Sequence, residues 1–175
     1  MQGRILHLSD IHFGCENKGA VAAVAELANS QAVDLVAITG DITQYGRKTE
    51  FAAAAAFVRA LLPPKLITPG NHDVPYAHPE RLIAPFRRYE GCFGDAWMTA
   101  FDKEGLAVRA FNSSRGTQVR LNWSKGSVWP DQAREAVPDG RSSASPLRSG
   151  APPAPACRSG PFPPQAPPPE GAAHR

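Results

Sequence analysis

The sequence is poor in cysteine and in net charge, and it contains no long hydrophobic run. Its three cysteines, Cys15, Cys92 and Cys157, are an odd number without CxxC spacing, which fits a reducing compartment better than a disulfide scaffold. The net charge is +3 and no Lys/Arg stripe is present, so the pattern indicates no nucleic-acid-binding patch. No signal-peptide pattern precedes the first strand-like segment, and no apolar run is long enough to span a membrane. We therefore expect a cytoplasmic protein without a membrane segment.

Proline is scarce in most of the chain and concentrated at its end. Eleven of the 18 prolines lie within residues 138–175, where Pro, Ala, Ser, Arg and Gly fill 31 of 38 positions. A segment of this composition cannot bury enough apolar surface to offset its ordering entropy. We therefore expect one domain over residues 1–135, followed over residues 136–175 by a disordered tail.

Short apolar runs alternate with helix-like segments over the first 68 residues. Buried strands are expected over residues 4–9, 33–39 and 65–68, and helices over residues 19–31 and 47–62. This β-α-β-α-β order predicts an α/β fold of parallel strands joined by crossover helices. A further helix is expected over residues 79–89 and a fourth strand over residues 106–112.

Polar side chains that can bind metal follow each of the three strands directly. They are Asp10, His12, Asp41, Asn71, His72 and Asp73. One such Asp alone would be typical of a turn or a helix cap, but ligands of open α/β sheets bind beyond the carboxyl ends of the strands, where all six residues are expected. Carboxylates, imidazoles and an amide oxygen suit a divalent metal, and no GxSxG or GxxxxGK[ST] motif indicates other chemistry. Two ions held there would support in-line hydrolysis of a phosphate ester.

Three sequence blocks, each at a strand end, resemble a known family. Asp10-Ile-His12, Gly40-Asp41 and Gly70-Asn71-His72-Asp73 look, in order and spacing, like the first three signature blocks of the calcineurin-like metallophosphoesterases. The surrounding text, LSDIHFG, GDIT and TPGNHDVP, is similar to the bacterial branch that includes cyclic-AMP phosphodiesterases. The resemblance covers about residues 3–132 and implies the first half of a four-layer αββα sandwich.

The resemblance also implies a set of metal ligands. Asp10 and His12 would ligate a first ion, Asp41 would bridge, and Asn71 would ligate a second ion. The ions expected for the family are two divalent metals, Mn, Fe or Zn. The glycines before Asp41 and Asn71 permit tight turns and close approach of the backbone.

The third block implies the catalytic groups. His72 would lie near the scissile phosphate and stabilise its charge or protonate the leaving oxygen, and Asp73 would orient the His72 ring. Asn71 and His72 would both contact the substrate. A metal-bridged hydroxide would then hydrolyse a phosphoester, for which a small phosphodiester such as a cyclic nucleotide is the first expectation. A phosphomonoesterase or a nuclease of the same family is an alternative.

After Asp73 the sequence departs from the family pattern. The later His-His and Gly-His-x-His blocks are absent, since only His78 and His174 follow. The second ion would keep Asp41 and Asn71 alone, so the other alternative is a catalytically impaired remnant that binds at most one metal or phosphate. We interpret the change of composition near residue 133 as a passage out of the ancestral reading frame into GC-rich DNA; a genuine Pro-rich tail is the alternative, and translation of the other two frames decides between them.

Overall fold

The computed structural model describes residues 3–76, 78–94, 100–116, 125–131 and 134. At its centre lies a three-stranded parallel sheet whose strands follow chain order: β1 (Ile5–Leu8), β2 (Leu35–Thr39) and β3 (Lys65–Thr68). The central strand β2 is the most deeply buried, with Leu35, Val36 and Ile38 fully inaccessible. Burial on both faces explains why this strand reads as an unbroken apolar run in the sequence. The expected parallel strands are confirmed.

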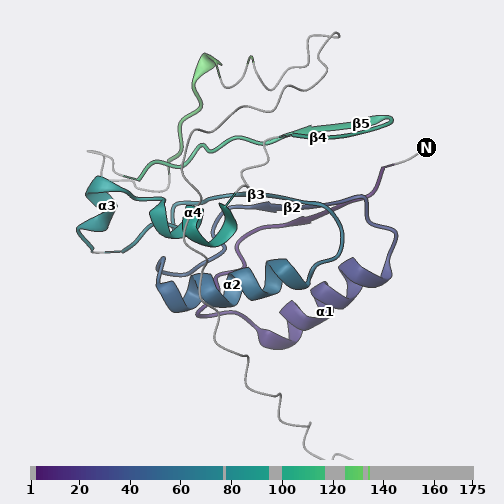
Figure 1. The fold of residues 1–175 in the computed structure, drawn as a ribbon, viewed down its shortest axis with the longest axis horizontal. Coiled ribbons are helices and arrows are strands. Elements are labelled where there is room, and N and C mark those ends of the chain that lie inside the picture. The colour runs from purple at the N-terminus through teal and green to yellow at the C-terminus, as the bar shows by residue number, and fades with distance from the viewer. Residues whose placement is uncertain (1–2, 77, 95–99, 117–124, 132–133, 135–175) are drawn as a thin grey trace, which may run out of the picture.

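Two long helices cover one face of this sheet (Figure 1). They are α1 (Lys18–Ser30) and α2 (Lys48–Ala60), within a residue or two of the expected helices. The side chain of Asn17 caps α1 by accepting a hydrogen bond from the Ala20 amide at 3.1 Å. At the start of α2, the buried carboxylate of Glu50 accepts the Tyr45 and Arg47 amides at 2.8 and 3.0 Å, so the loop before α2 is held by its first turn.

The core lies between the sheet, α2 and a short helix, α4 (Arg87–Phe93). Phe51 of α2 is fully buried, and its ring lies edge-on to Tyr89 and Phe93, with centroids 6.4 and 6.3 Å apart. Burial, and secondly the Asp73 carboxylate, raise the pKa of Tyr89, so this phenol stays neutral. The aromatic cluster thus fixes α4 against α2.

The prediction of one continuous helix over residues 79–89 is wrong. The structure has α3 (Glu80–Ile83) and then α4, separated at Ala84, whose φ of −148° and ψ of 69° are not helical. Pro85 explains the break, because proline lacks an amide proton and disfavours the helical conformation of the residue before it.

The fourth strand is present as β5 (Leu106–Arg109), but it does not extend the parallel sheet. It pairs antiparallel with β4 (Ala100–Lys103), which the sequence did not lead us to expect, and the turn between them contains Gly105 at φ 77°. This hairpin lies on the side of the sheet opposite α1 and α2 (Figure 1), and an ion pair of Lys103 with Asp34 joins it to the start of β2.

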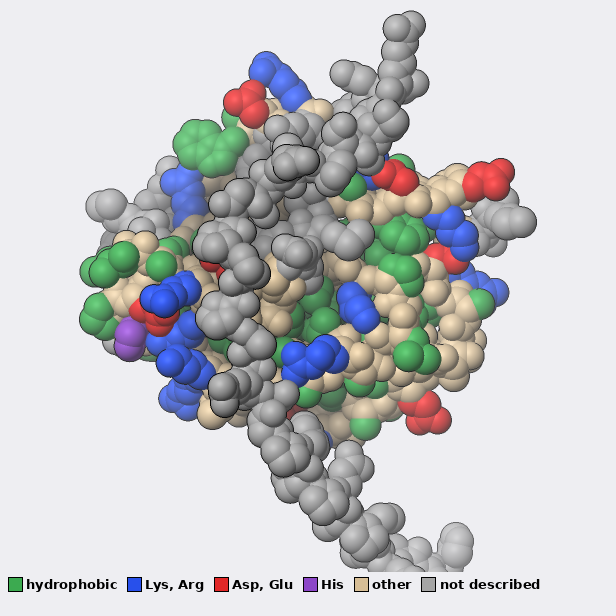
Figure 2. All heavy atoms as spheres, viewed as in Figure 1, with side chains coloured by type: hydrophobic (Ala, Val, Ile, Leu, Met, Phe, Trp, Pro, Cys, Tyr) green, Lys and Arg blue, Asp and Glu red, His purple; other side chains and the backbone are tan. Residues whose placement is uncertain are grey.

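Basic side chains gather at the end of the molecule that carries α3 and α4 (Figure 2). Arg88 of α4 forms an ion pair with Glu80 of α3 at 2.7 Å and donates a further hydrogen bond to the Gly46 carbonyl at 2.9 Å. Arg81 of α3 donates to the Gly116 carbonyl at 3.0 Å. The two arginines therefore tie this corner to loops that lie far away in the sequence.

These elements form the expected α/β arrangement, with one helical layer on one sheet, which is the first half of an αββα sandwich. The expected disordered tail, residues 136–175, lies outside the described residues. No helix within the described ranges has the length and hydropathy needed to cross a membrane.

Replacement of Phe51 tests this packing. Phe51→Ala should lower the free energy of unfolding by about 3 to 5 kcal/mol, because it leaves a cavity among Tyr89 and Phe93. Phe51→Leu, which keeps most of the buried volume, should cost about 1.5 kcal/mol or less. Urea denaturation followed by circular dichroism measures both. The control is Leu82→Ala on α3, a side chain 76% exposed, which should change stability by less than about 0.5 kcal/mol. Equal losses at positions 51 and 82 would contradict the assignment of the core.

Candidate metal centre

The loops that follow β1 and β2 continue the pairing of these strands beyond the sheet. Amides of the first loop donate to carbonyls of the second at 2.8–3.3 Å: Asp10 to Gly40, His12 to Asp41 and Phe13 to Ile42. The Gln44 amide returns a bond to the Phe13 carbonyl at 3.1 Å. The two loops, residues 10–13 and 40–44, are therefore held side by side along their length.

Three residues of these loops have a left-handed backbone. Among the described residues, Asp10, His12 and Asp41 are the non-glycine residues with positive φ, at 55°, 51° and 50°. This conformation costs an L-residue about 1 kcal/mol or more, and Asp and His tolerate it better than most. Such strain concentrates at functional sites. Here it falls on three of the four residues for which the sequence predicts metal binding, Asn71 being the fourth.

Side-chain atoms of the same three residues converge. Asp10, His12 and Asp41 each offer a ligand atom, and these atoms lie within 4.8 Å of one another. Asp10 Oδ1 lies 3.9 Å from His12 Nε2, and His12 Nδ1 is buried without a hydrogen-bond partner in the described part of the chain. A buried ring nitrogen normally has a partner, and two carboxylates with an imidazole are a donor set that divalent metals accept. These residues therefore fit a divalent ion.

Glycines allow the loop after β3 to touch the loop after β2. A Cβ on Gly70 would overlap Asp41 Oδ1 and the Asp41 amide nitrogen, and a Cβ on Gly40, at φ 76°, would lie 3.1 Å from the Gly70 Cα. The close approach expected of these glycines is confirmed. It brings Asp41 and Asn71 to the same point of the sheet edge.

The buried side chain of Asp73 joins the loops that follow β2 and β3. Its carboxylate is fully buried and accepts four hydrogen bonds at 2.8–3.2 Å, from the amides of Ile42, Thr43 and Gly70 and from the Thr43 hydroxyl. Burial raises the pKa of the Asp73 carboxyl, and these hydrogen bonds act in the opposite direction. Asp73 is therefore a positioning residue within the described structure.

The ring of His72 is oriented differently from expectation. Its Nδ1 lies 2.8 Å from the Gln44 carbonyl, whereas Asp73, expected to orient the ring, binds backbone amides instead. Because a carbonyl only accepts, Nδ1 is the donor, and Nε2 is left as the second functional nitrogen. The His72 amide donates to Asp41 Oδ1 at 2.9 Å, and the ring lies edge-on to His12 with centroids 4.9 Å apart. Sequence reasoning missed Gln44, since any residue type can supply a carbonyl.

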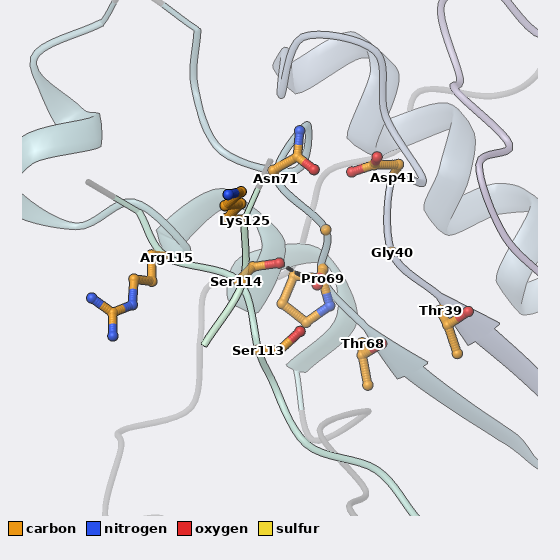
Figure 3. A pocket seen from close by; sticks show the side chains of 12 residues that line it. Thr39, Gly40, Asp41, Thr68, Pro69, Asn71, Ser113, Ser114, Arg115 and Lys125 are labelled. Carbon is orange, nitrogen blue, oxygen red and sulfur yellow. Dashed lines mark hydrogen bonds between the residues drawn. The ribbon is translucent and has the colours of Figure 1, made fainter. Parts of the chain in front are cut away.

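A cavity of about 250 Å³ opens beside Asp41 and Asn71 (Figure 3). One wall comes from the ends of β2 and β3 and the loops that follow them; the other comes from residues 113–115 and 125–126. The side chains of Asp41 and Asn71 face each other at its rim, while Asp10 and His12 do not line it. Asp41 thus separates the Asp10–His12 pair from the cavity, and Asn71 lies on the cavity side.

Comparison with known proteins agrees with this geometry. The profile of the family described as calcineurin-like phosphoesterase matches residues 3–132. A glycerophosphodiester phosphodiesterase, GpdQ of Enterobacter lignolyticus (strain SCF1), is 34% identical over 80 residues, an alignment that covers 39% of this chain. The same alignment spans 29% of the relative, less than a third of its length.

Gly70→Ala should weaken metal binding without removing any ligand. The added methyl group would displace Asp41, so we expect the affinity for Mn²⁺ to fall about 10- to 100-fold, as for other changes that disturb ligand orientation. Isothermal titration calorimetry with Mn²⁺ measures the effect. The matched control is Gly91→Ala in α4, where a Cβ would meet no atom within 4 Å and Ala is the better helix former. Unchanged Mn²⁺ affinity in Gly70→Ala would show that Asp41 is not a ligand.

The stability of Asp73→Asn and of Asp10→Asn should distinguish the structural carboxyl group of Asp73 from the predicted metal ligand Asp10. Asp73→Asn places amide protons against backbone donors, which should lower the free energy of unfolding by about 3 kcal/mol. Asp10→Asn, with a side chain 66% exposed, should change stability by less than about 0.5 kcal/mol, since Asn also accepts a left-handed backbone. Thermal unfolding in the presence of EDTA measures both. The assignment fails if Asp10→Asn proves the more destabilising change.

Proposed function

Because the chain belongs to the calcineurin-like phosphoesterase family, we propose that it hydrolyses a small phosphoester with the help of divalent metal ions. The observation that carries the proposal is the convergence of Asp10, His12 and Asp41 at the carboxyl edge of the sheet, each on a left-handed backbone. A backbone that is strained at three ligand residues, and at no other non-glycine position described, is typical of a site built for binding.

The chain's own residues would divide the work as follows. Asp10, His12 and Asp41 would hold one ion, and Asp41 together with Asn71 would hold a second on the cavity side. Ions bound there would supply positive charge opposite the phosphoryl oxygens and activate water near neutral pH. The Asp41 carboxylate keeps its orientation because Oδ1 accepts the His72 amide at 2.9 Å.

His72 is suited to deliver a proton to the leaving oxygen. With Nδ1 donating to the Gln44 carbonyl, the ring cannot rotate freely, and Nε2 carries the transferable proton when the ring is charged. Gln44 is itself held: the next amide, that of Tyr45, is bound by Glu50, and the preceding one, that of Thr43, by Asp73. The orientation of one imidazole thus depends on two buried carboxylates.

The cavity and the relative both support a proposal for the kind of substrate. A volume of about 250 Å³ suits a small molecule, and the relative named as a glycerophosphodiester phosphodiesterase acts on a phosphodiester by its name. We therefore propose a small phosphodiester, such as a cyclic nucleotide, as the substrate class, ahead of a phosphomonoester or a nucleic acid.

A second candidate is binding without turnover. The whole sequence holds five histidines, and the described residues hold a single group of three or more His, Cys, Asp or Glu side chains fit for an ion, that of Asp10, His12 and Asp41. This ligand set is smaller than the one that two ions would need. It supports a chain that binds one ion, or a phosphate, without hydrolysing a substrate.

Hydrolysis of bis(p-nitrophenyl) phosphate during a Mn²⁺ titration distinguishes the two. If the chain is an enzyme, Asp41→Asn should lower turnover about 100-fold or more, because several kcal/mol of charge stabilisation are lost. Asp102→Asn, which removes a carboxylate from the β4–β5 hairpin, is the control and should keep full activity. Binding of one ion without turnover would support the second candidate. Faster hydrolysis of p-nitrophenyl phosphate would assign a phosphomonoesterase.

A further inference from the structure

The second wall of the cavity, residues 113–115 and 125–126, is held in place by hydrogen bonds and close packing. The Ser114 hydroxyl donates to the Pro69 carbonyl at 3.0 Å, which anchors this wall on the loop after β3. The Ser127 amide donates to the Ser113 carbonyl at 2.8 Å, and a Cβ on Gly126 would lie only 2.8 Å from that same oxygen. Residues 113–114 and 125–127 therefore pack tightly against each other at the rim.

This wall brings positive charge to a cavity whose opposite wall carries the acid Asp41. Among the residues that line the cavity, Arg115 and Lys125 are cationic and Asp41 is anionic. Figure 3 shows the Arg115 guanidinium directed away from Asp41 and Asn71, and this group lies over the Trp129 ring, 5.6 Å from its centroid. Lys125 lines the same wall, and Figure 3 shows it beside Asn71.

We propose that Lys125 forms an anion subsite that holds phosphate oxygens of the substrate against Asp41 and Asn71. A lysine ammonium offers three donors and makes charge-assisted hydrogen bonds to phosphate, which are stronger than neutral ones. With metal at Asp41 on one side and Lys125 on the other, an anion in the cavity is attracted from both walls. This proposal deepens the proposed function and rests on it for the substrate, but the subsite itself is a property of the wall.

Lys125→Gln and Lys125→Arg test the subsite by the binding of inorganic phosphate. With Mg²⁺ present, a ³¹P NMR titration should show about tenfold weaker phosphate binding in Lys125→Gln, the loss of one charged hydrogen bond, and near wild-type binding in Lys125→Arg. Lys125 is exposed, so the unfolding midpoint should not change. The matched control is Arg59→Gln, which removes an equal charge. Arg59 lies in the last turn of α2, near the start of β3, whereas the cavity lies at the end of β3.

Turnover gives a second readout. Lys125→Gln should raise KM for bis(p-nitrophenyl) phosphate by a similar factor with little change in kcat, because Lys125 binds and does not react. Equal phosphate affinity in wild type and Lys125→Gln, or an equal loss in Arg59→Gln, would overturn the subsite. Absence of hydrolysis in the wild type, together with phosphate binding that depends on Lys125, would refute the proposed function and leave the subsite standing.

Discussion

The buried carboxylate of Asp73 is the interaction on which the site depends, because it holds the loops after β2 and β3 together. It takes amide protons from Gly70 of its own loop and from Ile42 and Thr43 of the neighbouring one. A buried carboxyl group needs hydrogen-bond partners for its oxygens, so neither loop can move without leaving one of these oxygens unsatisfied. Asp41 and Asn71, which lie next to these anchor points in the chain, are positioned as a consequence.

Beside this buried carboxyl group, three predicted metal-binding residues adopt a backbone conformation that L-residues usually avoid. Asp10, His12 and Asp41 hold a left-handed backbone, and hydrogen bonds between the two loops offset the cost. The ladder of amides and carbonyls therefore brings together, at the sheet edge, three side chains that are fit to hold a metal ion. The arrangement also explains the glycine before Asn71, since Gly70 must pass Asp41 without a side chain.

The cavity adds what the metal ligands alone do not provide. It has one acidic wall from the parallel sheet and one basic wall from residues that follow the β4–β5 hairpin. The hydrogen bonds of Ser114 to the Pro69 carbonyl and of Arg81 to the Gly116 carbonyl anchor the second wall to the rest of the molecule. The groups proposed for phosphate binding and for proton transfer therefore lie on different parts of the chain, and the His72 ring packs against His12.

The sequence by itself determined the β-α-β-α-β order, the strand over residues 65–68 and the gathering of Asp10, His12 and Asp41 at one sheet edge, because periodicity and strand ends are local signals that the fold preserves. Pro85 was also a local signal, but a helix was expected across it. The tertiary structure alone decided that Gln44 orients His72, that Asp73 binds the neighbouring loop, and that Lys125 lies across from Asp41. The reason is physical: a backbone carbonyl has no signature in the sequence, and contacts between residues more than 25 positions apart are set by how the loops pack, not by the residues beside them.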